Sequence, residues 1–221
     1  MGLAQQSVRP GRTTLLQAVN TLLQNIGEMP VDSLENQQVQ DARIAEQTLL
    51  EFAREGQLRG WSWNTERAYP FDRDSGTGEV EVPDAAVAWS VDPYRYNGRY
   101  VLRGGRVYDK TNRTFKISEL DAPIKADVTW LLSWDDSPEA FNRWTTIRSA
   151  RVFSTRMLGS DSVTNYTAVD EQAAMTELMR VEFEQSQPNS LTGGPYGGAP
   201  VPTYVAGAGL RRGPFGGARL G

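Results

Sequence analysis

The stretch YVLRGGRVY, residues 100–108, carries the strongest local signal in the 221-residue sequence. Two short runs rich in β-branched and aromatic residues flank the pair Gly104-Gly105. Glycine readily adopts the positive φ angles that a two-residue hairpin turn needs. The stretch therefore predicts an antiparallel β-hairpin, so at least part of the chain folds as a β-sheet.

Strand-like patterns continue on both sides of this hairpin. Residues 61–69 alternate with a period of two, which is typical of a strand and places Trp61 and Trp63 on one face. We expect residues 61–134 to form a small antiparallel β-subdomain inserted between helices. Its further strand candidates are Val80, Val82, Phe115, Ile117 and the stretch 124–134.

Two helices are predicted before the β-subdomain. Thr13 or Thr14 can cap the first helix, whose apolar residues recur at helical spacing up to a stop at Gly27. Ser33 is expected to cap the second helix, which Gly60 ends. Two pairs within the second helix have the spacing of surface ion pairs. They are Glu51 with Arg54 and Glu55 with Arg59.

Two more helices are predicted after the β-subdomain. The third begins near Ser137, with Pro138 at its first helical position, and Gly159 ends it. The fourth is expected from about Ser162 to Glu184, with Ala174, Leu178 and Val181 as its buried residues and with an acidic side. The acidic residues on that side are Asp170, Glu171, Glu177 and Glu182.

The two ends of the chain differ from its middle in composition. Residues 187–221 are dominated by Gly and Pro and contain no acidic residue, so they cannot bury enough apolar surface to fold alone. The predicted fold class is α+β: a four-helix bundle with an inserted small antiparallel β-subdomain and an extended C-terminal arm. The predicted segments are an N-terminal arm (1–12), a first helical hairpin (13–60), the β-subdomain (61–134), a second helical hairpin (135–186) and the C-terminal arm (187–221).

The composition excludes several classes of function. The sequence has no cysteine and no histidine, so it offers no thiol nucleophile, no Ser-His-Asp triad and no HExxH zinc site. It has no P-loop motif, and we expect no cofactor and no bound metal. A net charge of −4 creates no strong attraction to nucleic acid or to an acidic membrane. No apolar run is long enough to span a membrane.

Paired carboxylates leave one enzymatic alternative, a carboxylate-based peptidoglycan hydrolase. Glycoside hydrolysis needs two carboxyl groups at a set separation, one of them with a raised pKa. Acidic residues at the start of a helix also complement its dipole, and we expect this structural role instead of catalysis. The candidate carboxylates are Asp135, Asp136 and Glu139 in one cluster, and Glu46, Glu51 and Glu55 along the second helix.

Two binding functions are also open. Tryptophans can stack on sugars or bases, but we expect Trp61, Trp63 and Trp144 to pack in a core or a subunit interface. A DNA-binding module is the other alternative, because the C-terminal arm is basic. Its three arginines would support only weak, salt-sensitive binding. They are Arg211, Arg212 and Arg219.

A series of short motifs resembles one family when the motifs are taken in order. Their order and spacing over residues 14–184 are similar to those of the tail tubular protein A family of short-tailed podophages. The motifs are Ala18-Val19-Asn20, Ile26-Gly27-Glu28, Pro30-Val31, Arg59-Gly60-Trp61, Arg103-Gly104-Gly105, Val107-Tyr108-Asp109 with Thr111, Pro138-Glu139-Ala140-Phe141 and Ala150-Arg151.

This resemblance implies a structural adaptor and not an enzyme. Proteins of that family form a twelve-fold homo-oligomeric ring below the portal protein, and the ring receives the tail nozzle protein and the side fibres. DNA passes through the lumen without specific binding. The resemblance implies that the helices face the portal and the β insertion faces the nozzle. The protein would belong to the virion tail and be assembled in the host cytoplasm.

Two further expectations follow for such a ring. The lumen should be lined by polar or acidic side chains, with the acidic side of the fourth helix as a candidate, because a basic lining would hold the phosphates. The C-terminal arm should bind the portal protein or a neighbouring subunit in an extended form. Its expected anchors are Tyr196, Tyr204, Leu210, Arg211, Arg212 and Phe215.

Overall fold

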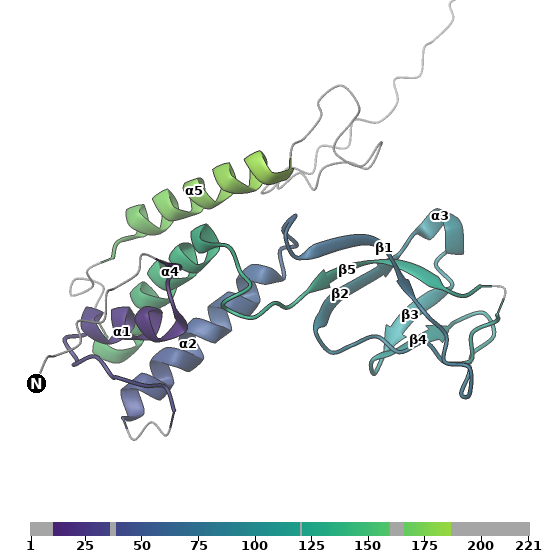
Figure 1. Ribbon diagram of the computed structural model, residues 1–221, viewed down its shortest axis with the longest axis horizontal. Helices are drawn as coiled ribbons and strands as arrows, with labels where there is room; N and C mark the ends of the chain where they lie inside the picture. Colours follow the sequence, from purple (N-terminus) through teal and green to yellow (C-terminus); the bar gives the residue numbers. More distant parts are fainter. Residues whose placement is uncertain (1–10, 36–38, 120, 160–165, 187–221) are drawn as a thin grey trace, which may run out of the picture. The chain divides into compact units, whose positions relative to one another are not determined.

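The computed structural model describes residues 11–35, 39–119, 121–159 and 166–186. Helices and small antiparallel sheets make up these residues, which confirms the α+β class (Figure 1). The elements in chain order are α1 (Leu15–Asn25), α2 (Gln40–Gln57), β1 (Thr65–Phe71), β2 (Ala86–Val91), α3 (Pro93–Tyr96), β3 (Tyr100–Arg103), β4 (Arg106–Asp109), β5 (Ile124–Trp130), α4 (Glu139–Leu158) and α5 (Ala168–Ser186).

The start of α1 follows the sequence prediction, and the start of α2 does not. Thr14 caps α1 in a capping box, in which the Thr14 side chain and the Gln17 side chain each accept from the other residue's backbone N–H. Ser33 does not cap α2, which begins at Gln40 without a side-chain cap. The Ser33 hydroxyl instead accepts from the backbone N–H of Glu35 and closes a local turn.

The two later helices begin further along the chain than the sequence suggested. Pro138 is the N-cap of α4 and not its first helical residue, while Gly159 at the other end has a left-handed φ of 66° as expected for a stop. The α5 helix begins at Ala168 instead of Ser162. Thr167 and Asp170 hold its start, because the Asp170 carboxylate accepts from both the backbone N–H and the hydroxyl of Thr167.

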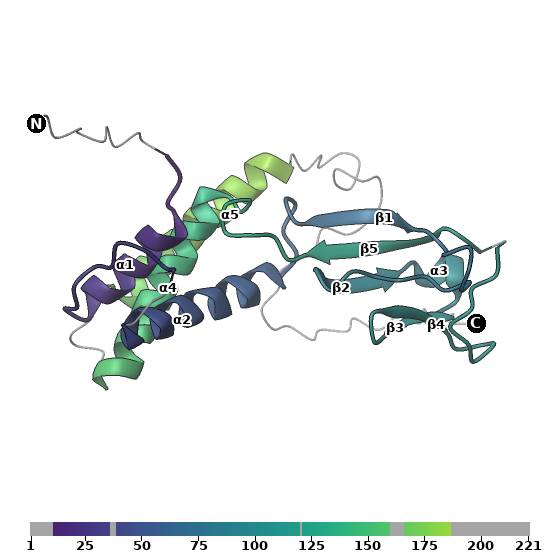
Figure 2. The ribbon, with the colours of Figure 1, turned by 60° about the horizontal axis from the view of Figure 1, so that its bottom comes forward.

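Helices α1, α2 and α4 pack against one another pairwise around one apolar core (Figure 2). Alanines on α1, α2 and α4 allow the helices to approach closely, and Phe141, Trp144 and Phe153 of α4 fill the centre. The α5 helix joins this core through Ala174 and Leu178. The four-helix bundle itself therefore stays a prediction, since the pairwise helix packing is among three helices.

Gly56 lies where α2 comes closest to α4. A Cβ atom built on Gly56 would sit 2.7 Å from a Trp144 ring carbon and 2.9 Å from a Phe141 ring carbon, closer than real carbon atoms approach. Both rings are almost completely buried. The absent side chain at Gly56 thus sets the distance between α2 and α4.

The β part contains a three-stranded antiparallel sheet in the order β1-β5-β2 and the two-stranded hairpin β3-β4. The hairpin confirms the prediction for residues 100–108, with Gly104 and Gly105 at φ values of 55° and 72°. Val80 and Val82 are buried but belong to no strand; Val80 O accepts from the backbone N–H of Val107. The residues of this second core are Phe71, Val80, Val82, Ala86, Tyr96, Tyr100, Val107, Ile117, Ile124, Ala126 and Val128.

The strand predicted from Trp61 and Trp63 is wrong, because β1 begins only at Thr65. Trp61 is buried in the helical core, and its indole N–H donates to Gly56 O at 2.9 Å. Trp63 packs against the same core, with its ring centroid 5.1 Å from that of Phe141. Residues 61–64 therefore form a turn whose large side chains face the helices, although their alternation resembles that of a strand.

A carboxylate organises the loop after the β3-β4 hairpin. Asp109 is 1% exposed and accepts from Arg99 at 2.6 and 2.9 Å, from the backbone N–H groups of Thr111 and Asn112, and from the Asn112 amide. Arg99 also reaches Asp121, which accepts from the Tyr100 hydroxyl. The hydrogen bonds from Arg99 hold the pKa of Asp109 below its usual value. Asp109 is thus a charged anchor for the loop after β4 and for Arg99 just before β3.

Two amide side chains join the segment that leaves α2 to the segment that leaves β5. The buried Gln57 side chain accepts from the backbone N–H of Leu132 at 2.7 Å and donates to its carbonyl at 3.1 Å. The Asn64 amide donates to both Gln57 O and Trp130 O, each at 3.0 Å. Trp130 N donates to Asn64 O at 2.7 Å, so the chain's two passages between helices and strands are bonded to each other.

Candidate assembly surface of the helices

The expected anchors of the C-terminal arm lie outside the described residues. They are Tyr196, Tyr204, Leu210, Arg211, Arg212 and Phe215. A candidate surface must therefore be built from the helices, whose outward side chains are described. The three tryptophans singled out in the sequence do not contribute to it, because Trp61, Trp63 and Trp144 pack in the helical core as predicted.

The carboxylates considered for catalysis are engaged in structural contacts. Glu139 accepts from the Thr13 backbone N–H at 2.8 Å and from the Thr13 hydroxyl, which ties the entry of α4 to the entry of α1. Asp136 accepts from the Ser133 hydroxyl at 2.7 Å. These contacts fix the residues before α1 and α4, in agreement with the structural role expected for the cluster.

Arginines of α4 join three helices through ion pairs. Arg148 donates to Glu171 of α5 at 2.8 Å and to Glu55 of α2 at 3.1 Å, and Arg151 donates to Glu171 at 2.9 Å. Burial acts to raise the pKa of Glu171, but the hydrogen bonds from Arg148 and Arg151 outweigh it, so this pKa lies below its usual value. Glu171 therefore holds α5 on α4 as a carboxylate.

A second arginine of α4 changes the pairing expected within α2. Arg156 donates to Glu51 at 3.1 Å, and its guanidinium lies 5.7 Å from the centre of the Phe52 ring. Glu51 and Glu55 thus pair with α4, and the predicted pairs within the helix, Glu51 with Arg54 and Glu55 with Arg59, are wrong. The guanidinium of Arg148 also stacks on the Phe52 ring, at 4.9 Å from its centre. Arg148 and Arg156 therefore combine an interhelical ion pair with stacking on Phe52.

The acidic residues of α5 do not form one surface. Glu171 and Glu182 are turned toward the body of the protein, where Glu182 accepts from the Ser62 backbone N–H and hydroxyl. Asp170 and Glu177, seven residues apart, lie together on another side of the helix, where Asp170 bonds Thr167 and Glu177 pairs with Arg180. Of the acidic side expected on the fourth helix, only Asp170 and Glu177 face away from the body of the protein.

The outer side of α5 carries large apolar side chains. Val169, Met179 and Phe183 are 77%, 44% and 65% exposed. Together with Gln172 and Thr176 they repeat at intervals of three and four residues, which places all five on one stripe of the helix. This stripe lies opposite Ala174 and Leu178, which face the core. We call it the α5 seam.

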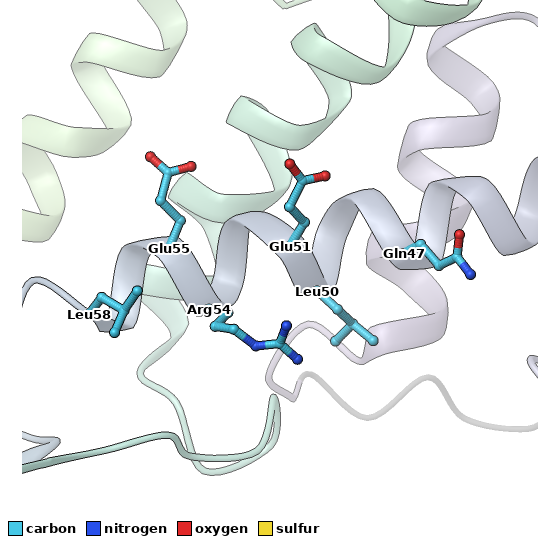
Figure 3. A pocket seen from close by; sticks show the side chains of 6 residues that line it. All are labelled: Gln47, Leu50, Glu51, Arg54, Glu55 and Leu58. Atoms are coloured by element: carbon cyan, nitrogen blue, oxygen red, sulfur yellow. The ribbon is translucent and has the colours of Figure 1, made fainter. Parts of the chain in front are cut away.

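The outer side of α2 has a similar stripe. Figure 3 shows Glu51 and Glu55 on one side of α2 and Leu50, Arg54 and Leu58 on the other, around a shallow depression that also includes Gln47. Leu50 and Leu58 are 41% and 49% exposed. We call the stripe formed by Arg43, Gln47, Leu50, Arg54 and Leu58 the α2 seam.

The described helices carry exposed apolar side chains that are suited to packing. Within the described ranges, no cluster of acidic residues could hold a metal ion, and no helix is both long and apolar enough to cross a bilayer. The two seams were not predicted from the sequence. Their three- and four-residue spacing was the available signal.

Comparison with known protein families gives a match over most of the chain. Residues 16–188 match the sequence model of a family described as Tube, tail tubular protein. No curated protein sequence matches the chain. The matched segment runs from the second residue of α1 to beyond the end of α5, so it includes all the described helices and strands.

Proposed function

Because the chain belongs to the tail tubular protein family, we propose that it is the adaptor ring of a short phage tail, which joins the portal protein to the tail nozzle protein. Family membership makes it a structural component of a phage tail. In this proposal twelve copies form a closed ring, DNA leaves the head through the lumen, and side fibres attach outside. The helices, completed as a four-helix bundle by α5, face the portal, and the β-subdomain faces the nozzle.

The family match is the observation that carries this proposal, since it extends over both the helical and the β part of the chain. One feature of the surface supports it. Large apolar side chains are exposed on α2, on α5 and at the end of α4, where Met157 and Leu158 are 37% and 42% exposed. Exposed apolar groups on several helices favour burial against neighbouring subunits.

The ring is tested by the mass of the purified protein with and without the portal protein. We expect a species of about 290 kDa, twelve times the 24.5 kDa subunit, either alone or on the portal. Native mass spectrometry separates this species from a monomer or a two-fold dimer. A 24.5 kDa monomer that neither assembles nor binds the portal would contradict the adaptor function.

We further propose that residues 187–221 bind the portal protein or a neighbouring subunit in an extended form. Truncation after Ser186 should leave a folded adaptor that docks poorly on the portal, with at least a tenfold loss of affinity, because the anchors listed above are removed. A portal pull-down together with the melting temperature of the truncated chain measures both properties. Docking by the truncated chain with wild-type affinity would refute the arm.

A matched control separates anchoring from chain length. A full-length variant with Tyr196→Ala, Tyr204→Ala and Phe215→Ala keeps the glycines, the prolines and the charges of the arm. We expect this variant to dock nearly as poorly as the truncated chain, because the aromatic side chains would fill the pockets of the partner. Wild-type docking by this variant would assign the effect to the backbone and charges of the arm instead.

A further inference from the structure

The two seams cannot meet within one chain. The α5 seam lies on the side of α5 opposite the residues that contact the core, and α5 is tied to α4 by Glu171. On α2, the exposed Leu50 and Leu58 lie away from Glu51 and Glu55, which pair with α4 (Figure 3). Each seam is therefore an outward surface of the same helical layer, and contact between them requires a second molecule.

The side chains along the two seams are complementary in shape. The α5 seam projects Met179 and Phe183, and the α2 seam borders the shallow depression that is lined by Gln47, Leu50, Glu51, Arg54, Glu55 and Leu58. Both stripes follow the spacing of three and four residues at which one helix places its side chains into the gaps of another. Packing of one seam on the other would bury the exposed apolar groups of both.

The charges along the two seams are also complementary. On α2, neither the Arg43 nor the Arg54 guanidinium has a hydrogen-bond or ion-pair partner among the residues that the structure describes. On α5, Glu177 and Glu184 flank the single Arg180 beside the seam, which leaves a net negative charge there. Opposite charges beside an apolar contact fix its register and suppress wrong pairings.

From this complementarity we infer that the α5 seam of one copy packs on the α2 seam of the next copy. The contact joins two different surfaces and is therefore heterologous, the kind of contact that builds a ring when the repeated rotation closes. The inference rests on the proposed ring and identifies the surfaces that hold it together. The partner is a second copy of this chain, because both complementary surfaces belong to it.

Cysteine cross-linking tests the contact directly, since the chain has no cysteine of its own. A full-length variant with both Leu50→Cys and Met179→Cys should form a ladder of covalent multimers on oxidation, up to the complete ring. The matched control combines Met179→Cys with Gln24→Cys, an exposed position on α1 outside both seams. The control and the two single variants should give no ladder.

Replacement of a seam leucine gives a second measurement. Leu50→Lys should raise the protein concentration at half-assembly at least tenfold, because a charge enters the apolar contact. Leu102→Lys is the matched control, since Leu102 is 36% exposed and lies in β3, away from both seams. Both variants should melt at nearly the wild-type temperature, because both side chains are exposed in the single chain.

The outcomes distinguish this contact from the proposed function. A ring of wild-type mass that gives no ladder with Leu50→Cys and Met179→Cys contradicts the contact and leaves the adaptor ring standing. If Leu50→Lys assembles at the same protein concentration as wild type, the contact is likewise contradicted and the adaptor ring stands. A wild-type chain that remains a monomer with the portal contradicts the ring and the contact together.

Discussion

Replacement of Gly56 by valine should lower the free energy of unfolding by about 3 kcal/mol, which corresponds to a fall of roughly 6–12 °C in the melting temperature. The first new carbon atom would already lie 2.7 Å from the Trp144 ring and 2.9 Å from the Phe141 ring. Neither ring can move into solvent, so α2 must move away from α4. Thermal and denaturant unfolding followed by circular dichroism measure the change.

Valine also lowers helix propensity, and this contribution needs its own control. Gln24→Val introduces the same side chain at an exposed position of α1 and should cost only about 0.5 kcal/mol. Gly56→Ala should fall between the two, because the gain of about 1 kcal/mol in helix propensity offsets part of the overlap with the rings. A Gly56→Val protein as stable as the Gln24→Val protein would mean that Gly56 does not set the helix spacing.

Replacement of Asp109 by alanine should cost about 3 kcal/mol, because it removes a buried carboxylate and leaves Arg99 without its closest partner. The loop after β4 loses the acceptor of two backbone N–H groups at the same time. Denaturant unfolding monitored by tryptophan fluorescence gives the free energy. Asp84→Ala is the matched control, since Asp84 is exposed in the same β part, and should change stability by less than about 0.5 kcal/mol.

The Asp109 variant should also change how stability depends on pH. The folded-state pKa of Asp109 is held below the value of about 3.9 of an unfolded aspartate, first by the Arg99 hydrogen bond. Its contribution is therefore fully present above about pH 4 and is lost as the pH falls through the lower folded-state pKa. Wild type should lose more stability than Asp109→Ala on acidification below pH 4. Parallel curves for the two proteins would contradict the role of this carboxylate.

The parts of the fold that depend on neighbouring residues in the sequence could be predicted from it. Gly104-Gly105 identifies the hairpin because the positive φ angles of the turn favour glycine. Thr14 caps α1 because its hydroxyl reaches the backbone three residues on. The helical and strand regions followed from periodicity, which depends only on the spacing of apolar side chains.

The errors occurred where contacts distant in the sequence decide the local structure. Trp61 follows a strand-like alternation, but it turns into the helical core because an indole N–H partner and a ring contact are available there. Glu51 and Glu55 do not form the ion pairs expected within α2. They pair with Arg156 and Arg148 of α4, whose guanidinium groups also stack on Phe52. Periodicity cannot choose between such partners.

The candidate surface was partly readable in the sequence. The exposed acidic side of α5 was predicted as one face, yet Glu171 and Glu182 are turned inward by Arg148, Arg151 and Ser62. Ala174 and Leu178 are buried as the sequence predicted, whereas Val181 is only half-buried. The sequence did not predict that Val169, Met179 and Phe183 would form an exposed stripe on the other side of α5, because apolar residues on two sides of a helix do not show what covers each side.

The amide bonds of Gln57 and Asn64 have a mechanical consequence. They bond the segment after α2 to the segment after β5, so the sheet is attached by two covalent connections that are locked in register. A pull or a twist on the strands is shared between both connections. Neither can slide past the other before four hydrogen bonds break, three made by the two amides and one from the Trp130 N–H to Asn64 O. A torque applied to the strands is therefore transmitted to the helices, and the sheet cannot rotate freely about its two connections.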